Sequence, residues 1–95
     1  MTDIHDLDEI LNLHQLWLAD DPTGCRANLA GVDLSGVDLY GVNLSRAGLT
    51  GAHLYGAKLY RAKLGGADLI DANLTSANLV GADLTGAILP EGWAQ

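Results

Sequence analysis

The sequence has no phenylalanine, only two prolines and a single cysteine, and aromatic residues make up 5% of its 95 residues. A chain of this length is marginal for an ordinary globular core, and the lack of large aromatic side chains makes such a core harder to build. The core must therefore be aliphatic and finely divided, which favours a stacked repeat over a globule. Because Cys25 is the only cysteine, no disulfide can form within the chain.

Basic residues are also scarce. Five Lys and Arg stand against twelve Asp and Glu, so the net charge is -7. This balance argues against direct binding to nucleic acid or to an anionic membrane, because both attract clustered Lys and Arg. Residues 1–45 carry eight acids and one arginine, whereas residues 46–95 carry four acids and four basic residues. An acidic first half suits a protein partner that has a basic, nucleic-acid-binding surface.

Long hydrophobic runs are missing as well. No segment approaches the ~18 apolar residues of a membrane span. The first residues are acidic and lack the basic segment that opens a signal peptide. We therefore expect no membrane partner, and a location in the bacterial cytoplasm, or in the host cytoplasm if a phage encodes the chain.

What the sequence has instead is a leucine at every fifth position from Leu29 to Leu89, thirteen in all. Alanine or valine stands two residues before each leucine, so each five-residue unit, or pentad, has two inward-facing apolar positions separated by one outward-facing residue. Glycine fills eight of the thirteen positions two residues after leucine, where it enters positive-φ turns without a steric penalty. A period of five fits neither a helix nor a flat strand. The pattern predicts short extended steps joined by corners, which wind a coil with leucines stacked inside.

The pentads closely resemble the A(D/N)LXX consensus of the pentapeptide repeat family, as in Ala-Asn-Leu-Ala-Gly at 27–31 and Ala-Asp-Leu-Thr-Gly at 82–86. The resemblance implies a β solenoid, a right-handed quadrilateral β-helix with four pentads per coil and a little over three coils. It divides the chain into an N-terminal α-helical cap with its connecting turn (1–25), the β-helix (26–91) and a short C-terminal tail (92–95). Residues twenty apart then lie above one another on one face.

The two ends of the repeat differ in what covers them. Residues 3–19 have the apolar spacing of an amphipathic helix, which Thr2 or Asp3 would cap, and this helix covers the first coil as repeat arrays require. At the other end Pro90 lacks the N–H that a further coil would use. Either Trp93 folds over this end, or the end stays apolar and open to a partner or to a second copy in a homodimer.

No arrangement of residues predicts catalysis. The histidines are His5, His14 and His53, and the first two are nine residues apart, which does not place them side by side on a helix. Cys25 has no nearby ligands with which to form a zinc site. We expect His14 to be a packing and hydrogen-bonding residue of the helix. The chain is predicted to be no enzyme, with no catalytic residue, no metal and no cofactor.

Two sets of residues are predicted to bind a partner. The first is an acidic patch on the cap and the first coil, formed by Asp3, Asp6, Asp8, Glu9, Asp20, Asp21, Asp33 and Asp38. The second is aromatic, with Tyr40 and Tyr60 stacked on one face, Tyr55 on the adjoining face, and Trp93. A basic corner in the middle coil, made of Lys58, Arg61 and Lys63, is interpreted as a solvated charged face.

The resemblance offers imitation of DNA as a function, because some members of the family present an acidic rod to gyrase. Duplex DNA carries one charge per ~1.7 Å, whereas the repeats here hold six acids against four basic residues. The acidic cap and first coil would have to do the imitating. Our leading hypothesis is a compact inhibitor of the phage or mobile-element type that blocks a bacterial DNA-binding complex, such as a CRISPR surveillance complex. Two alternatives stay open: a gyrase- or topoisomerase-binding protein of the quinolone-protection type, and a non-enzymatic interaction scaffold.

Overall fold

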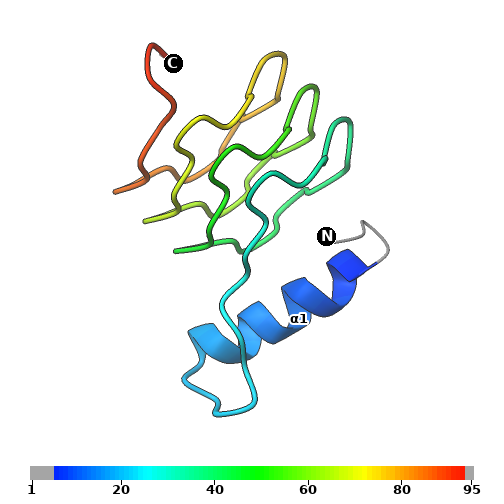
Figure 1. Cartoon of the computed structure of the whole chain (residues 1–95), viewed down its shortest axis with the longest axis vertical. Helices are drawn as coiled ribbons and strands as arrows, with labels where there is room; N and C mark the ends of the chain where they lie inside the picture. The colour runs from blue at the N-terminus through cyan, green and yellow to red at the C-terminus, as the bar shows by residue number, and fades with distance from the viewer. Residues whose placement is uncertain (1–5, 94–95) are drawn as a thin grey trace.

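The computed structural model describes residues 6–93, which form one helix and a coiled stack of pentads (Figure 1). Helix α1 (Leu7–Leu18) lies across one end of the stack, and the coils rise from it toward the C-terminus. The described part measures 37 × 26 × 21 Å. None of its helices is long and apolar enough to cross a membrane.

Nine parallel β-bridges join the coils, and each links residues twenty apart, from Asn28 with Gly48 to Asp68 with Ile88. This register confirms the predicted solenoid with four pentads in each coil. Each bridge consists of two backbone hydrogen bonds between one coil and the next. The amide of Gly48 donates to the Ala27 carbonyl at 3.0 Å, and the Leu29 amide donates to the Gly48 carbonyl at 2.7 Å. Because one residue per pentad is paired on each side, the strands are single-residue bridges.

The core is a column of leucines and alanines inside the coils. The leucines from Leu29 to Leu74 and the alanines or valine that precede most of them are buried, whereas the residue between them points outward. Burial weakens toward the C-terminal end, where Leu79, Leu84 and Leu89 are half-buried. The aliphatic core predicted from the missing phenylalanine is therefore present, and it thins at the far end of the stack.

Positive φ angles recur at the corners, as the glycine pattern predicts. Eight corner glycines have φ between 65° and 73°. Four corners place a side chain in the same left-handed region, at Arg46, Arg61, Asp71 and Ser76, with φ between 56° and 64°. The corner geometry therefore belongs to the coil and not to glycine alone.

Helix α1 covers the first coil with its apolar side, where Leu7, Ile10 and Leu11 pack against the leucine core. The helix lies within the predicted span 3–19 and ends at Leu18, and the proposed capping residues Thr2 and Asp3 lie outside the described part of the chain. Asp6 takes the N-cap position without forming a side-chain cap bond. The segment that leads from α1 back to the stack passes very close to the helix. A Cβ at Gly24 would lie 2.1 Å from the backbone nitrogen of Trp17. Only glycine fits there without a backbone shift.

Candidate functional site

His14 fastens α1 to the stack. It is fully buried, and its Nδ1 accepts a hydrogen bond from the Ala27 amide at 3.0 Å. Nδ1 must therefore be unprotonated, so Nε2 carries the proton and donates it to the Ser45 carbonyl at 2.8 Å. This confirms the predicted packing and hydrogen-bonding role. Both ring nitrogens are used, which leaves His14 no free position for a metal or a substrate.

The electrostatic surroundings keep His14 neutral. Burial lowers the pKa of its imidazole most strongly, and the positive charges of Arg26 and Arg46 lower it further, although the bond to Ser45 works in the opposite direction. The ring also stacks on Trp17, with centroids 5.5 Å apart, and the Arg46 guanidinium lies 5.0 Å from the centre of that indole. This cluster is structural, because it joins the helix to the first turn of the solenoid.

The residues of the predicted acidic patch are exposed where the structure describes them, but they do not gather in one place. Asp6 lies at the start of α1, with Asp8 and Glu9 in its first turn, whereas Asp20 and Asp21 follow its end. A helix of 12 residues separates the two groups by roughly 18 Å. The remaining members, Asp33 and Asp38, lie on successive faces of the first coil, and Asp3 lies outside the described residues.

Local hydrogen bonds favour the ionised form of two of these carboxylates. The Thr23 hydroxyl and amide both donate to Asp21, at 2.6 and 2.8 Å, and these bonds lower the pKa of Asp21. The Ser35 amide donates to Asp33 at 3.0 Å, and its bonds lower the pKa of Asp33. The same side chain-to-amide turn occurs on every face of the solenoid, from Asn28 to Asp83. An Asp or Asn at the outward position therefore stabilises the coil, whatever else it does.

The tyrosine ladder, defined as Tyr40, Tyr60 and Val80, runs along one corner of the stack. The Tyr40 and Tyr60 rings are in contact, with centroids 6.5 Å apart and planes tilted by 42°. This confirms the predicted stacking of residues twenty apart. Tyr40 is 62% exposed and Val80 is 68% exposed. The first and third coils therefore present exposed side chains at this corner, and the half-buried Tyr60 lies between them.

The basic corner lies beside the ladder, and its two lysines sit in mixed columns. Lys58 bridges Asp38 and Asn78, and Lys63 bridges Asn43 and Asp83. Each lysine thus has an aspartate in a neighbouring coil, which reduces the positive field that this corner presents. The side chain stem of Arg61 lies against Gly81 of the next coil, because a Cβ at Gly81 would lie 3.1 Å from the Arg61 Cγ. The basic corner therefore consists of two lysines whose charges are partly neutralised and one arginine whose stem packs against Gly81.

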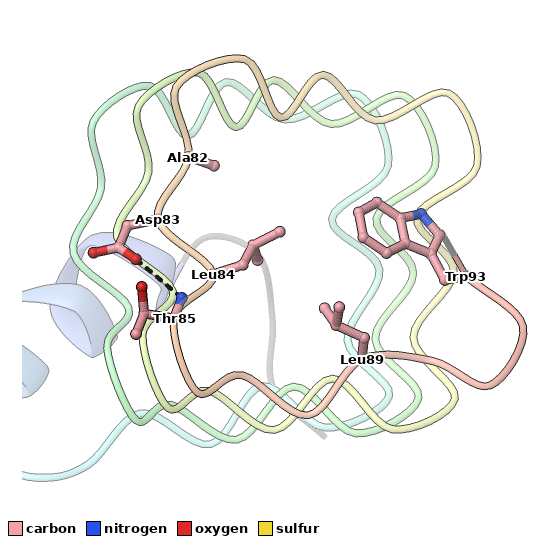
Figure 2. Close-up of a pocket in the computed structure, with 6 residues that line it drawn as sticks. All are labelled: Ala82, Asp83, Leu84, Thr85, Leu89 and Trp93. Carbon is pink, nitrogen blue, oxygen red and sulfur yellow. Dashed lines mark hydrogen bonds between the residues drawn. The ribbon is translucent and has the colours of Figure 1, made fainter. Parts of the chain in front are cut away.

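The C-terminal end of the stack holds an open depression of about 490 Å³, lined by Ala82, Asp83, Leu84, Thr85, Leu89 and Trp93 (Figure 2). Leu84 and Leu89 point into it, and Trp93 lies at its far side, whereas the Asp83 carboxylate points outward toward the Thr85 amide. Trp93 packs against the core but remains half-buried. It thus covers one side of the end and leaves the other side open.

Three further residues singled out by sequence are placed as follows. Tyr55 is 53% exposed at the corner before Lys58, so it borders the same face as Tyr60 but does not join the ladder. Cys25 is exposed on the segment that follows α1. In residues 6–93 no three His, Cys, Asp or Glu side chains come together in a way that could hold a metal ion.

Two features of the structure were not predicted from the sequence. The contact of Trp17 with Arg46 joins residues 29 positions apart, and neither the spacing of the helix nor the pentad pattern indicates it. The second feature is the edge of the last coil, where the Leu79 and Leu84 amides have no backbone acceptor among residues 6–93. The register of twenty residues could have revealed that edge, because it says which groups each coil offers to the next one.

The chain is similar to known proteins throughout the repeat. A family model described as pentapeptide repeats matches residues 27–66 and 52–89, with eight copies. Among solved structures, Rfr23, a pentapeptide repeat protein from the cyanobacterium Cyanothece 51142, is 38% identical over 65% of the chain, with a TM-score of 0.63. The chain spans 43% of the length of that protein. The pentapeptide repeat protein alr5209 from Nostoc Pcc 7120 is 34% identical and is matched over 87% of the chain and 86% of its own length, with a TM-score of 0.34. No curated protein matches the chain.

Proposed function

This chain belongs to the pentapeptide repeat family, and from that premise we propose that it is a protein-binding module which holds its partner on the tyrosine ladder. Proteins of this family are generally non-catalytic, and we extend that property to this chain. The partner is a protein, no cofactor takes part, and the compartment is the bacterial cytoplasm, or the host cytoplasm for a phage-encoded chain.

The exposed ladder carries this proposal. Tyr40 and Tyr60 contact each other and Val80 follows in the next coil, although each of the three could have been polar without any cost to the core. Tyrosine is enriched where proteins bind one another, because it buries a large area and still offers a hydroxyl group. The solenoid holds the ladder rigidly, since the residues two positions before and three positions after each rung are bridged to neighbouring coils, as Asp38 and Asn43 are on either side of Tyr40. Binding there would order little of the chain, which favours affinity.

A second function is favoured by a different observation. All described acids of the cap and first coil are exposed, and hydrogen bonds lower the pKa values of Asp21 and Asp33. Such a surface could occupy the basic channel of a DNA-binding complex, either a CRISPR surveillance complex or gyrase or another topoisomerase. The gap of roughly 18 Å between the two acidic groups of α1 weighs against close imitation of a duplex, which carries one charge per ~1.7 Å. We therefore place this inhibitor function second.

One experiment separates the two functions. Tagged protein is used to capture partners from a bacterial lysate at low and high salt, and the captured proteins are identified and quantified. The ladder variant replaces Tyr40 and Tyr60 by Ala. The acid variant replaces Asp6, Asp20 and Asp21 by Asn and Glu9 by Gln. A Tyr55→Ala variant serves as the matched aromatic control, and circular dichroism checks that all variants are folded.

The ladder proposal predicts that the ladder variant loses its specific partner by tenfold or more, which corresponds to roughly 1.4 kcal/mol or more. The acid variant and Tyr55→Ala should keep the partner, and salt should weaken the complex little. An inhibitor of DNA-binding machinery predicts the opposite: loss in the acid variant and a steep loss with salt. That result would replace the ladder proposal by the second function, and a competition assay between the protein and DNA would then test it directly.

A further inference from the structure

The edge of the last coil at Ala82–Thr85 offers a donor and an acceptor with no backbone partner among residues 6–93. One coil earlier, the equivalent groups are paired: the Asp83 amide donates to the Ala62 carbonyl at 2.9 Å, and the Leu64 amide donates to the Asp83 carbonyl at 2.8 Å. The Ala82 carbonyl and the Leu84 amide repeat this arrangement and point away from the stack. One residue of an extended segment could pair with both.

A depression lies next to this pair, and it has apolar side chains on its inner sides and the polar residues Asp83 and Thr85 at its rim. Ala82 and Leu84 line one side of the depression, and Trp93 lines the opposite side. Leu89 points into the depression between them (Figure 2). In the coils below, each buried leucine lies under the leucine of the next coil, as Leu64 lies under Leu84. The depression occupies the position that the next such side chain would take. It therefore suits an apolar side chain that follows the paired residue.

Charge complementarity defines the outward side chain of the incoming segment. Asp83 is exposed, and the nearby positive charge of Lys63 in the coil below contributes to lowering its pKa, after the larger effect of the bonds from Thr85. Residues 64–95 contain four acids and no lysine or arginine. A basic residue stacked on the free side of Asp83 would repeat the favourable charge that Lys63 places in the coil on the other side.

We propose that this edge binds an extended segment of a partner protein with the sequence small–basic–apolar, added as one more parallel strand. The small residue would lie over Ala82, the basic residue would pair with Asp83, and the apolar residue would enter the depression beside Trp93. Ala62–Lys63–Leu64 has this sequence and occupies the same place one coil below. Strand addition to an exposed edge is a common mode of peptide recognition, in which backbone bonds supply affinity and pockets supply specificity.

A second copy of the chain is a poorer occupant of this end. The last coil carries Asp71 and Asp83, Glu91 follows it, and no basic residue lies beyond Lys63. Two such ends brought together would face each other with like charges, which disfavours association. The predicted homodimer through the C-terminal end is therefore kept as an outcome of the test, and a basic partner segment is the proposed occupant.

Synthetic peptides test the proposal on the full chain. The first is a blocked heptapeptide centred on Ala-Lys-Leu. Two matched controls replace its lysine by glutamate or methylate the lysine's backbone nitrogen, which removes the donor expected to bond the Ala82 carbonyl. Binding is measured by calorimetry and by NMR titration that follows the amides of Leu84 and Thr85. We expect saturable binding of the first peptide with shifts at both amides, and at least a fivefold weaker affinity for each control.

Two protein variants complete the test. Asp83→Asn keeps the side chain-to-amide turn, which asparagine forms at Asn73 and Asn78, but removes the charge; it should weaken binding roughly twofold to fivefold, as for an exposed ion pair. Asp71→Asn removes the same charge elsewhere on the last coil and should leave binding unchanged. Equal affinity for all three peptides, or no binding at all, would overturn the proposal. So would sedimentation that shows a stable dimer which the peptide cannot dissociate. None of these outcomes bears on the tyrosine ladder, which lies on a different surface.

Discussion

Four corner residues of the solenoid hold side chains in a backbone conformation that suits glycine. Arg46, Arg61, Asp71 and Ser76 have φ between 56° and 64°. For a residue with a Cβ this left-handed region costs roughly 1–2 kcal/mol, and less for aspartate. Arg46 has a compensating contact with Trp17. Ser76 has no such compensating contact in the described part of the chain, so a glycine there should regain the free energy that the strain costs.

Ser76→Gly is expected to stabilise the protein by about 0.5–1 kcal/mol, because the relief of strain exceeds the extra chain entropy of glycine in the unfolded state. Gly36 and Gly56 occupy the same corner in the two coils below, and nothing lies within 4 Å of a Cβ placed at either. Gly56→Ser is therefore the matched reverse change, and it should destabilise by a similar amount. Chemical denaturation measures both. A stabilised Gly56→Ser variant would show that corner strain does not govern stability here.

At the scale of the elements, the joint between α1 and the first coil depends on the protonation state of His14. The neutral ring accepts from Ala27 and donates to Ser45. A second proton would turn the acceptor nitrogen into a donor that faces another N–H. The joint is therefore built for the neutral imidazole, in agreement with the lowered pKa of His14.

Stability should consequently fall on mild acidification. The pKa of folded His14 lies below the ordinary value of 6.5, so the unfolded chain takes up a proton first. The contribution is fully present above pH 6.5 and decreases as the pH falls from there toward the folded pKa. Urea unfolding between pH 7.5 and pH 5 measures this slope. His14→Gln should be less stable and lose most of the slope, whereas His53→Asn, which changes an exposed histidine, should retain it.

The acid side chains act in a separate range. Hydrogen bonds lower the pKa values of Asp21, Asp33 and Asp83 below 3.8, so their contributions are present above that pH and are lost only in stronger acid. A slope between pH 6.5 and pH 5 that survives in His14→Gln would therefore assign the effect to a group other than these aspartates and His14.

How far sequence reasoning reached depends on whether a pattern repeats. The leucine period and the alanine or valine two residues earlier predicted the coil and its core, whereas the resemblance to the pentapeptide repeat family implied the twenty-residue register and the stacking of Tyr40 on Tyr60. Because the same inward and outward pattern recurs in thirteen successive pentads, the backbone must take the same path in each of them. The position of α1 has no such repetition. The contact of Trp17 with Arg46 depends on how the helix lies across the first coil, which periodicity does not specify.

At the scale of the whole molecule, the solenoid is paired at its centre, and its last coil is open as far as residues 6–93 show. Amides of the middle coils, such as those of Leu54 and Leu59, donate to the following coil, whereas the amides of Leu79 and Leu84 have no backbone acceptor among residues 6–93. In a stack whose units contact only their neighbours, stability is expected to decrease toward an uncovered end. The protein is therefore not uniform along its axis.

Native-state hydrogen exchange should reveal this gradient. We expect the Leu54 and Leu59 amides to exchange slowest, near the rate set by global unfolding, and the Leu79 and Leu84 amides to exchange at least a hundredfold faster. Addition of the Ala-Lys-Leu peptide should slow Leu84 and leave Leu79, on the preceding face, nearly unchanged. Uniform protection of all four amides would mean that the whole stack opens as one unit, contrary to a neighbour-by-neighbour arrangement.

The twenty-residue register also limits how such a gene can lengthen. A duplication of twenty codons would add one coil and leave every later side chain on its original face, because bridged residues stay twenty apart. A duplication of five codons would preserve the five-residue leucine period and the core, but it would move every later pentad to the next face of the solenoid. Tyr40 would then no longer lie beneath Tyr60 if the insertion fell between them. Foldability is thus indifferent to the number of pentads inserted, whereas a binding surface spread over several coils survives only whole-coil insertions.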